Sequence, residues 1–257
     1  MDERRINPIF IGHGSPINAI KRGRFSGFLG AYAASIPKPR AILVISAHWQ
    51  TEGIRITASA SPRQIYDFYG FPDELYALKY APPGSPELAR EISAEIPELA
   101  LDETRGIDHA GWAVAKHLYP DQDVPLLELS LDYTKREREH YELGKRLAPF
   151  ADRGVLVIGS GNLVHNLRES SFDDEARPFP WALAADEWFA ERIARDEDRE
   201  LIEYRDCMSG WQRALPTDEH YLPFLYILAM RRISGGARAV YEEIQNGSVS
   251  MRSVEMV

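Results

Sequence analysis

Four short, almost continuously apolar segments constrain the fold of this chain most strongly. Each is rich in Val, Ile or Leu and is bounded by Gly, Pro or polar residues; they span residues 8–12, 41–47, 124–130 and 154–159. A strand that alternates between apolar and polar residues exposes one face, whereas a continuous apolar run is typical of a strand covered on both faces. We therefore expect a sheet buried between two layers of helices.

Helix-like segments alternate with these strands. They span residues 25–36, 86–96, 110–118 and 134–150. This alternation favours an α/β fold with a central, largely parallel or mixed sheet flanked by helices on both faces. The chain has 257 residues, 44% of them hydrophobic, and no boundary between domains is evident. A chain of this size can bury one such core, so we expect a single domain over residues 1–257.

The remaining segments predict further elements around this core. Residues 53–59 alternate apolar and polar side chains, as a half-exposed or edge strand does. Two more helices are expected at residues 181–194 and 218–233. The tail resembles two strands, 237–244 and 247–255, joined through Asn246 and Gly247, and an Asn-Gly pair is a strong hairpin turn signal.

Charge and hydropathy exclude several classes of partner. The formal charge is −9, with 39 acidic and 30 basic residues and no long basic block, so duplex nucleic acid would be repelled. The longest apolar run, residues 221–230, is about half of the roughly 20 residues needed to cross a bilayer, and we find no signal segment. We expect a cytoplasmic protein without a membrane, nucleic-acid or obligate protein partner.

Missing motifs narrow the chemistry further. The single cysteine, Cys207, excludes an intramolecular disulfide and any CxxC site, so a bound metal would need histidine and carboxylate ligands. Ile17 stands where the third glycine of a dinucleotide-binding GxGxxG would fall, and the chain has no P-loop, GxSxG or HExxH motif. These absences exclude the commonest classes of nucleotide-binding protein, serine hydrolase and zincin metalloprotease.

Five of the seven histidines occupy positions that suggest a common site. His13 and His48 directly follow the first two expected strands, and His165 follows the fourth after a short connection. His220 lies near the start of an expected helix and His109 opens another. Taken singly, each is more simply a hydrogen-bonded structural residue. Open α/β sheets, however, bind ligands at the carboxyl ends of their strands, and converging imidazoles suit Zn, Fe, Cu or Ni.

An aromatic cluster allows two interpretations. Tyr66, Phe68, Tyr69, Phe71 and Trp49 could stack on a planar substrate above a metal, or they could be ordinary core packing beside a loop.

Seven short motifs, in order along the chain, resemble the 4,5-DOPA extradiol dioxygenase family. They are GHGSP at 12–16, SAHW at 46–49, YDFYGFP at 66–72, PPGSP at 82–86, DHAGW at 108–112, GNLVHN at 161–166 and EHYLP at 219–223. That family belongs to the class III extradiol dioxygenases, the superfamily of the protocatechuate 4,5-dioxygenase catalytic subunit. The resemblance covers residues 8–255.

The resemblance implies one divalent metal ion per chain, with Fe(II) expected for activity and Zn(II) possible. It also implies O2-dependent opening of a DOPA-like catechol beside its hydroxyl groups. By the family pattern, His13, His48 and His220 would be metal ligands. His165 would be the acid/base histidine or a further ligand, and His109 would contact the substrate or assist catalysis.

Two departures leave alternatives open. His220, beside Glu219, stands where members of the protocatechuate type place a carboxylate ligand. An all-nitrogen site also suits Zn(II), which would lower the pKa of bound water to about 7, so a zinc-dependent hydrolase is an alternative. A non-catalytic binding protein on the same fold is another. Tyr66 and Tyr69 replace the His and Gly usual in relatives, which leaves the identity of the catechol open.

Overall fold

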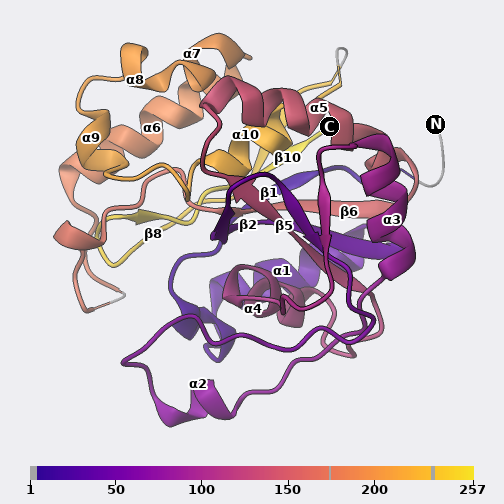
Figure 1. Ribbon diagram of the computed structural model, residues 1–257. Coiled ribbons are helices and arrows are strands. Elements are labelled where there is room, and N and C mark those ends of the chain that lie inside the picture. Colours follow the sequence, from indigo (N-terminus) through magenta and orange to yellow (C-terminus); the bar gives the residue numbers. More distant parts are fainter. Residues whose placement is uncertain (1–4, 174, 233–234) are drawn as a thin grey trace.

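The computed structural model describes residues 5–173, 175–232 and 235–257, and most of its strands form one sheet (Figure 1). The strands of this sheet are β1 (Ile9–Gly12), β2 (Ala41–Thr51), β3 (Arg55–Thr57), β4 (Ala100–Asp102), β5 (Leu126–Asp132), β6 (Val155–Gly161), β7 (Ala237–Tyr241) and β10 (Ser253–Met256). Their order across the sheet is β4-β3-β5-β2-β6-β1-β10-β7. A separate two-stranded sheet pairs β8 (Ile244–Gln245) with β9 (Val249–Ser250).

The sheet is mixed, as predicted. The four central strands β5, β2, β6 and β1 are parallel, whereas β10 runs antiparallel to β1 and β3 antiparallel to β5. The α-helices are α1 (Arg24–Ser35), α2 (Asp73–Ala77), α3 (Pro86–Glu95), α4 (His109–Leu118), α5 (Glu137–Asp152), α6 (Pro180–Ala194), α7 (Asp198–Ile202), α8 (Tyr204–Cys207), α9 (Trp211–Ala214) and α10 (Leu222–Leu228). Two 3-10 helices, η1 (Pro16–Ala19) and η2 (Leu167–Glu169), follow β1 and β6.

Helices cover both faces of the sheet, which confirms the prediction from the continuous apolar runs. Helices α1 and α4 lie on one face, and α3, α5 and α10 lie on the other (Figure 1). Successive side chains of a strand point to opposite faces, so Ile42 and Val44 of β2 pack toward α1 and α4. Leu43 and Ile45 of the same strand pack toward α5 and α10.

Three predicted elements differ from the structure. The strand expected at 53–59 is β3, which is not an edge strand because β4 lies beyond it. The turn at Asn246 and Gly247 is confirmed by φ angles of 55° and 72°, but the long hairpin is wrong. It is divided because the last strand pairs with β1 and β7 in the main sheet, leaving only β8 and β9 beside the turn. The helix expected at 218–233 is only α10, and residue 233 lies outside the described residues.

An irregular segment interrupts β2 near its carboxyl end. Ile45 pairs with Leu129 of β5, and the pairing resumes at Gln50 with Leu131, so residues 46–49 stand opposite a single residue. Extra residues of this kind bend a strand and redirect its side chains. His48, expected just after the strand, therefore lies within β2, in this irregular segment.

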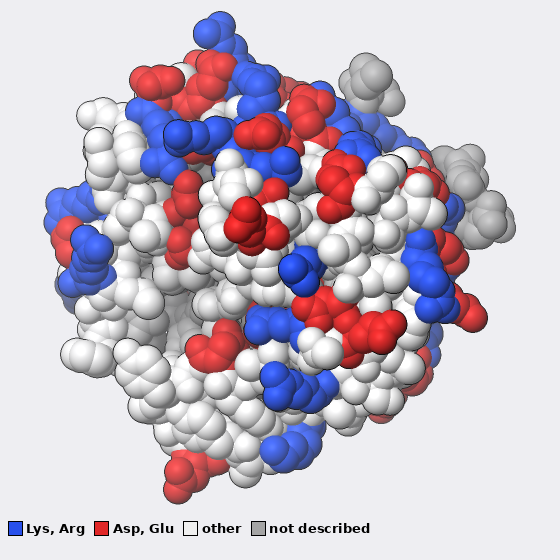
Figure 2. All heavy atoms as spheres, in the orientation of Figure 1, with Lys and Arg blue, Asp and Glu red and all other residues white. Residues whose placement is uncertain are grey.

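Charged side chains of both signs are interspersed on the face shown in Figure 2. No helix among the described residues combines the length and apolar character that crossing a bilayer requires.

Candidate metal centre and active site

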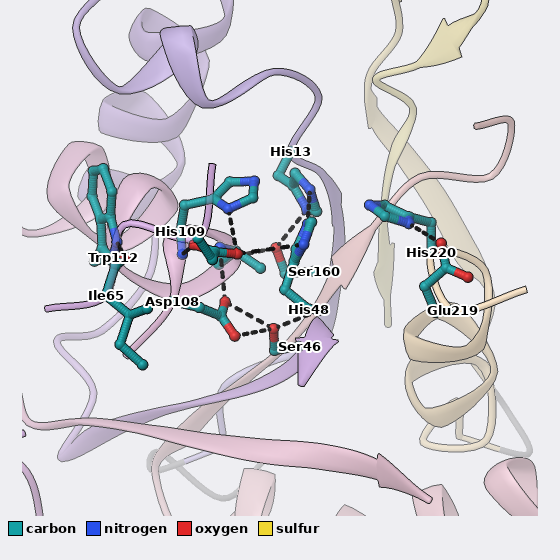
Figure 3. A network of polar contacts seen from close by, with 12 residues as sticks. His13, Ser46, His48, Ile65, Asp108, His109, Trp112, Ser160, Glu219 and His220 are labelled. Atoms are coloured by element: carbon teal, nitrogen blue, oxygen red, sulfur yellow. Dashed lines mark hydrogen bonds and ion pairs between the residues drawn. The ribbon is translucent and has the colours of Figure 1, made fainter. Parts of the chain in front are cut away.

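Three separate elements bring His13, His48 and His220 together at the carboxyl ends of the parallel strands (Figure 3). One ring nitrogen from each lies within 4.8 Å of the others. The ring centroids of His13 and His48 are 5.2 Å apart, and that of His220 lies 5.5 Å and 4.9 Å from them. This arrangement is what the positions of these histidines in the sequence predict.

Glycines allow the backbone segments that carry these histidines to approach closely. Gly14 has a φ of +62°, a left-handed conformation that turns the chain directly after His13. At the end of β6, a Cβ on Gly161 would lie 2.0 Å from the carbonyl oxygen of His220. The next residue, Asn162, donates its backbone N–H to that same oxygen over 2.8 Å. His220 is therefore fixed by its main chain against the end of β6.

Hydrogen bonds identify which nitrogen of His13 carries the proton. The Ser160 hydroxyl donates to the backbone oxygen of Ala110 over 2.8 Å, and its oxygen lies 3.1 Å from Nδ1 of His13. With its proton directed at Ala110, the hydroxyl is an acceptor toward His13. The proton is then on Nδ1, and Nε2 of His13 presents a lone pair.

The other two histidines are oriented by carboxylates. Nδ1 of His48 lies 3.4 Å from Oδ2 of Asp67, and Nδ1 of His220 lies 2.8 Å from Oε1 of Glu219. The Glu219 carboxylate accepts the Nδ1 proton of His220 and leaves its Nε2 unprotonated, which is the usual way in which metal-ligating histidines are held, and the negative charge of Asp67 favours the same proton position in His48.

The resulting lone pairs fit a metal ion. Nε2 of His13, whose proton is on Nδ1, lies 3.3 Å from Nε2 of His48, whose Nδ1 lies 3.4 Å from the charge of Asp67. With the His48 proton on Nδ1 as well, the two Nε2 lone pairs face each other, an arrangement that a cation near both would stabilise. Burial lowers the pKa of His13, His48 and His220 well below the usual value, and neighbouring histidines lower it further. The three rings are therefore neutral, as metal ligands must be.

His109 lies beside this group as the first residue of α4. Asp108 caps the helix by accepting the backbone N–H of Ala110 over 3.0 Å. Asp67 accepts both the backbone N–H of His109, over 3.0 Å, and its ring Nδ1–H, over 2.9 Å. The His109 ring is thereby oriented with its centroid 4.1 Å from that of His48.

His165 lies against the opposite side of the group. Its ring stacks on that of His220, with centroids 3.5 Å apart and planes 13° from parallel. Burial and, to a smaller extent, the neighbouring His109 lower the pKa of His165 to about 4, so the ring is neutral near pH 7. Neither ring nitrogen has a hydrogen-bond partner within the described parts of the chain. All five histidines singled out in the sequence thus lie in one site.

Asp67 and Ser160 were not singled out in the sequence, although each orients a histidine. Burial raises the pKa of Asp67, but the hydrogen bond from His109 and the nearby His48 outweigh this and hold it at about 2. Asp67 is the one acid of the mostly aromatic motif at 66–72, and that position is the only signal of its role in the sequence. No sequence signal marks Ser160.

The aromatic cluster is mostly core packing. Tyr66, Phe68 and Phe71 pack against the core on the α4 side of the sheet, and the Phe68 ring lies 5.6 Å from that of His109. Trp49 is buried beneath the guanidinium of Arg105. Tyr69 instead is 92% exposed.

The chain matches the profile of a protein family described as the catalytic LigB subunit of aromatic ring-opening dioxygenase over residues 25–243. It is 38% identical to the 4,5-DOPA dioxygenase extradiol of Escherichia coli K12, over 100% of this chain and 96% of that protein. It is 36% identical to the protein of the same name from Beta vulgaris, over 95% of this chain and 94% of that one.

A solved structure agrees with these matches. The crystal structure of an uncharacterized protein from Escherichia coli K12 superposes with a TM-score of 0.86 and 34% identity, over 98% of this chain and all of that one. Fold and sequence together define an extradiol aromatic ring-opening dioxygenase. The chain belongs to the LigB family, which confirms the resemblance drawn from its motifs.

Proposed function

We propose that this dioxygenase opens the ring of a DOPA-like catechol with O2, using one divalent metal ion held by His13, His48 and His220. The convergence of one ring nitrogen from each of these three neutral histidines carries the proposal. A bound Fe(II) ion would supply the redox chemistry that joins a chelated catecholate to O2. The names of the curated relatives support a DOPA-like substrate.

In this proposal His165 is the acid/base residue. It is neutral near pH 7, its ring nitrogens have no other partner among the described residues, and it stacks directly on the ligand His220. A neutral imidazole at this position accepts a proton from a catechol hydroxyl and can return it later in the reaction. His109 assists, since Asp67 binds its Nδ1–H and leaves Nε2 as a second acceptor.

Metal reloading tests the proposal directly. Protein stripped of metal and reloaded anaerobically with Fe(II) is expected to consume O2 when DOPA is added and to form a yellow ring-opened product. Metal-free protein and the Zn(II)-loaded form are the controls, and neither should consume O2. Ester or amide hydrolysis by the Zn(II) form without O2 would favour the zinc-dependent hydrolase instead. No O2 uptake over a panel of small catechols would contradict the proposal.

Replacing Asp67 with asparagine tests how the ligands are oriented. Asp67→Asn keeps the shape but removes the negative charge that binds Nδ1–H of both His48 and His109. Loss of such an outer partner typically costs about 10–100-fold in metal affinity or activity, and we expect a decrease of that size in affinity for Zn(II). Asp73→Asn, an exposed acid six residues along the chain, is the matched control. Equal affinities for Zn(II) in the two variants would show that Asp67 does not contribute to metal binding.

A further inference from the structure

A buried acid interrupts the apolar strand β5 below the site. Glu128 is fully buried, and its Oε1 accepts the backbone N–H of Asp108 over 3.0 Å. Its Oε2 has no hydrogen-bond partner among the described residues. Helix α4 approaches this side chain only because Gly111 has none: a Cβ there would lie 2.4 Å from Oε1. A buried carboxyl with one unpaired oxygen requires an explanation.

The neighbouring acid, Asp108, is also fully buried but is well supplied with donors. Its carboxylate accepts hydrogen bonds from Nη2 of Arg105 at 2.9 Å, from Oγ of Ser46 at 2.9 Å and from the backbone N–H of Ala110 at 3.0 Å. These donors, one of them a guanidinium, stabilise a negative charge on Asp108.

Two adjacent buried carboxyl groups cannot both be charged at low cost, so one of them keeps its proton. Asp108 has a cation and two further donors, whereas Glu128 receives one backbone N–H. The proton therefore belongs on Glu128. Burial raises the pKa of both groups, and the charge of Asp67 adds to the effect on Asp108, but the pKa of Glu128 is raised well above its usual value by burial and by the charge of Asp108.

The geometry points to Glu128 as a positioning residue that stays protonated at neutral pH. Its Oε1 accepts the backbone N–H of Asp108, and its Oε2, which has no partner among the described residues, carries the proton. A neutral group thus accepts the backbone N–H at the start of α4 without placing a second negative charge beside Asp108, which a carboxylic acid or an amide can do and a carboxylate cannot.

Two paths lead from this pair to the histidines. Asp108 caps α4, whose first residue is His109. It also accepts from Ser46, whose oxygen in turn accepts the backbone N–H of His48 over 3.0 Å. Figure 3 shows Asp108 and Ser46 directly beneath these two rings. Any effect of Glu128 on turnover rests on the proposed function, whereas its protonation does not.

An infrared comparison tests the protonation without metal or substrate. In metal-free protein at pH 7.5, the spectrum of wild type minus Glu128→Gln is expected to contain the carbonyl band of a protonated carboxyl group. The same subtraction with Glu87→Gln, an exposed acid of α3, should show only carboxylate bands. A carboxylate band in place of the carbonyl band for Glu128 would overturn the inference, whatever the enzyme does.

Kinetics of the Fe(II)-loaded protein test the positioning. Glu128→Gln keeps a neutral acceptor for the backbone N–H of Asp108, so kcat and KM for DOPA should remain within about threefold of wild type, whereas Glu128→Leu removes that acceptor and should lower kcat at least about tenfold. If Glu128→Leu does not fold, the infrared spectrum and the kinetics of Glu128→Gln still test whether a neutral group is sufficient at this position. A loss of kcat in Glu128→Gln together with a carboxylate band would show that a charged glutamate is needed. An active Glu128→Leu variant would show that Glu128 positions nothing.

Discussion

Replacing His13 with alanine is expected to abolish both metal binding and ring cleavage. The change removes one of the three converging ring nitrogens and leaves only His48 and His220 of this group to bind the metal. The decrease in metal affinity should exceed the roughly 10–100-fold that loss of an outer-shell partner costs. Zinc affinity, measured by competition with a chromophoric chelator, and O2 uptake of the Fe(II)-loaded protein check the prediction.

His117→Ala is the matched control for this variant. His117 is partly buried and bonded, through Nε2 to the backbone oxygen of Asn18 over 2.8 Å, but it is not in any group of described residues that could hold a metal ion. It should keep the metal. Full metal occupancy in His13→Ala would refute the ligand assignment. The test is informative because His13 precedes residues 25–243, which the family profile matches.

Replacing His165 with alanine is expected to separate turnover from metal binding. A general acid/base residue typically contributes about 10²–10⁴-fold to a rate, so kcat should fall by that factor. Metal content should stay near one ion per chain, because the three Nε2 donors of the cluster are intact. Metal analysis and single-turnover kinetics on the same sample check both parts.

Each alternative outcome for His165 has a distinct meaning. Loss of the metal together with activity would make His165 a fourth ligand, since its ring lies directly against that of His220. Unchanged kcat would indicate that His109, rather than His165, transfers the proton. Partial recovery of kcat on addition of free imidazole would support the acid/base role, because the cavity left by the side chain could admit the small molecule.

The layers of helix and sheet could be predicted because each strand shows in its own residues whether both of its faces are buried. A strand such as 154–159 is apolar at every position, which requires cover on both faces wherever the strand lies in the sheet. Strand order could not be predicted. The pairing of residues 253–256 with β1 depends on a contact between the two ends of the described chain, and nothing local distinguishes it from the long hairpin that the Asn-Gly turn predicts.

The site was only partly predictable for a similar reason. His13 and His165 follow recognisable strands, so topology alone brings them to one edge of the sheet. Asp67 reaches the site from a loop, and its role depends on tertiary contacts with His48 and His109. Glu128 does carry a local signal, since an acid inside the otherwise apolar run 124–130 conflicts with burial and often marks a function.

The pairing of β1 with β10 has a consequence for how the protein is made. Residue Gly12, next to His13, donates its backbone N–H to the hydroxyl of Ser253, 241 residues later. At a synthesis rate of about 5–20 residues per second, Ser253 is synthesised on the order of 10–50 s after β1. His13 is held by its full set of contacts only after that delay. Loading of the metal is thus expected to follow synthesis of the last strand rather than to guide the folding of the first.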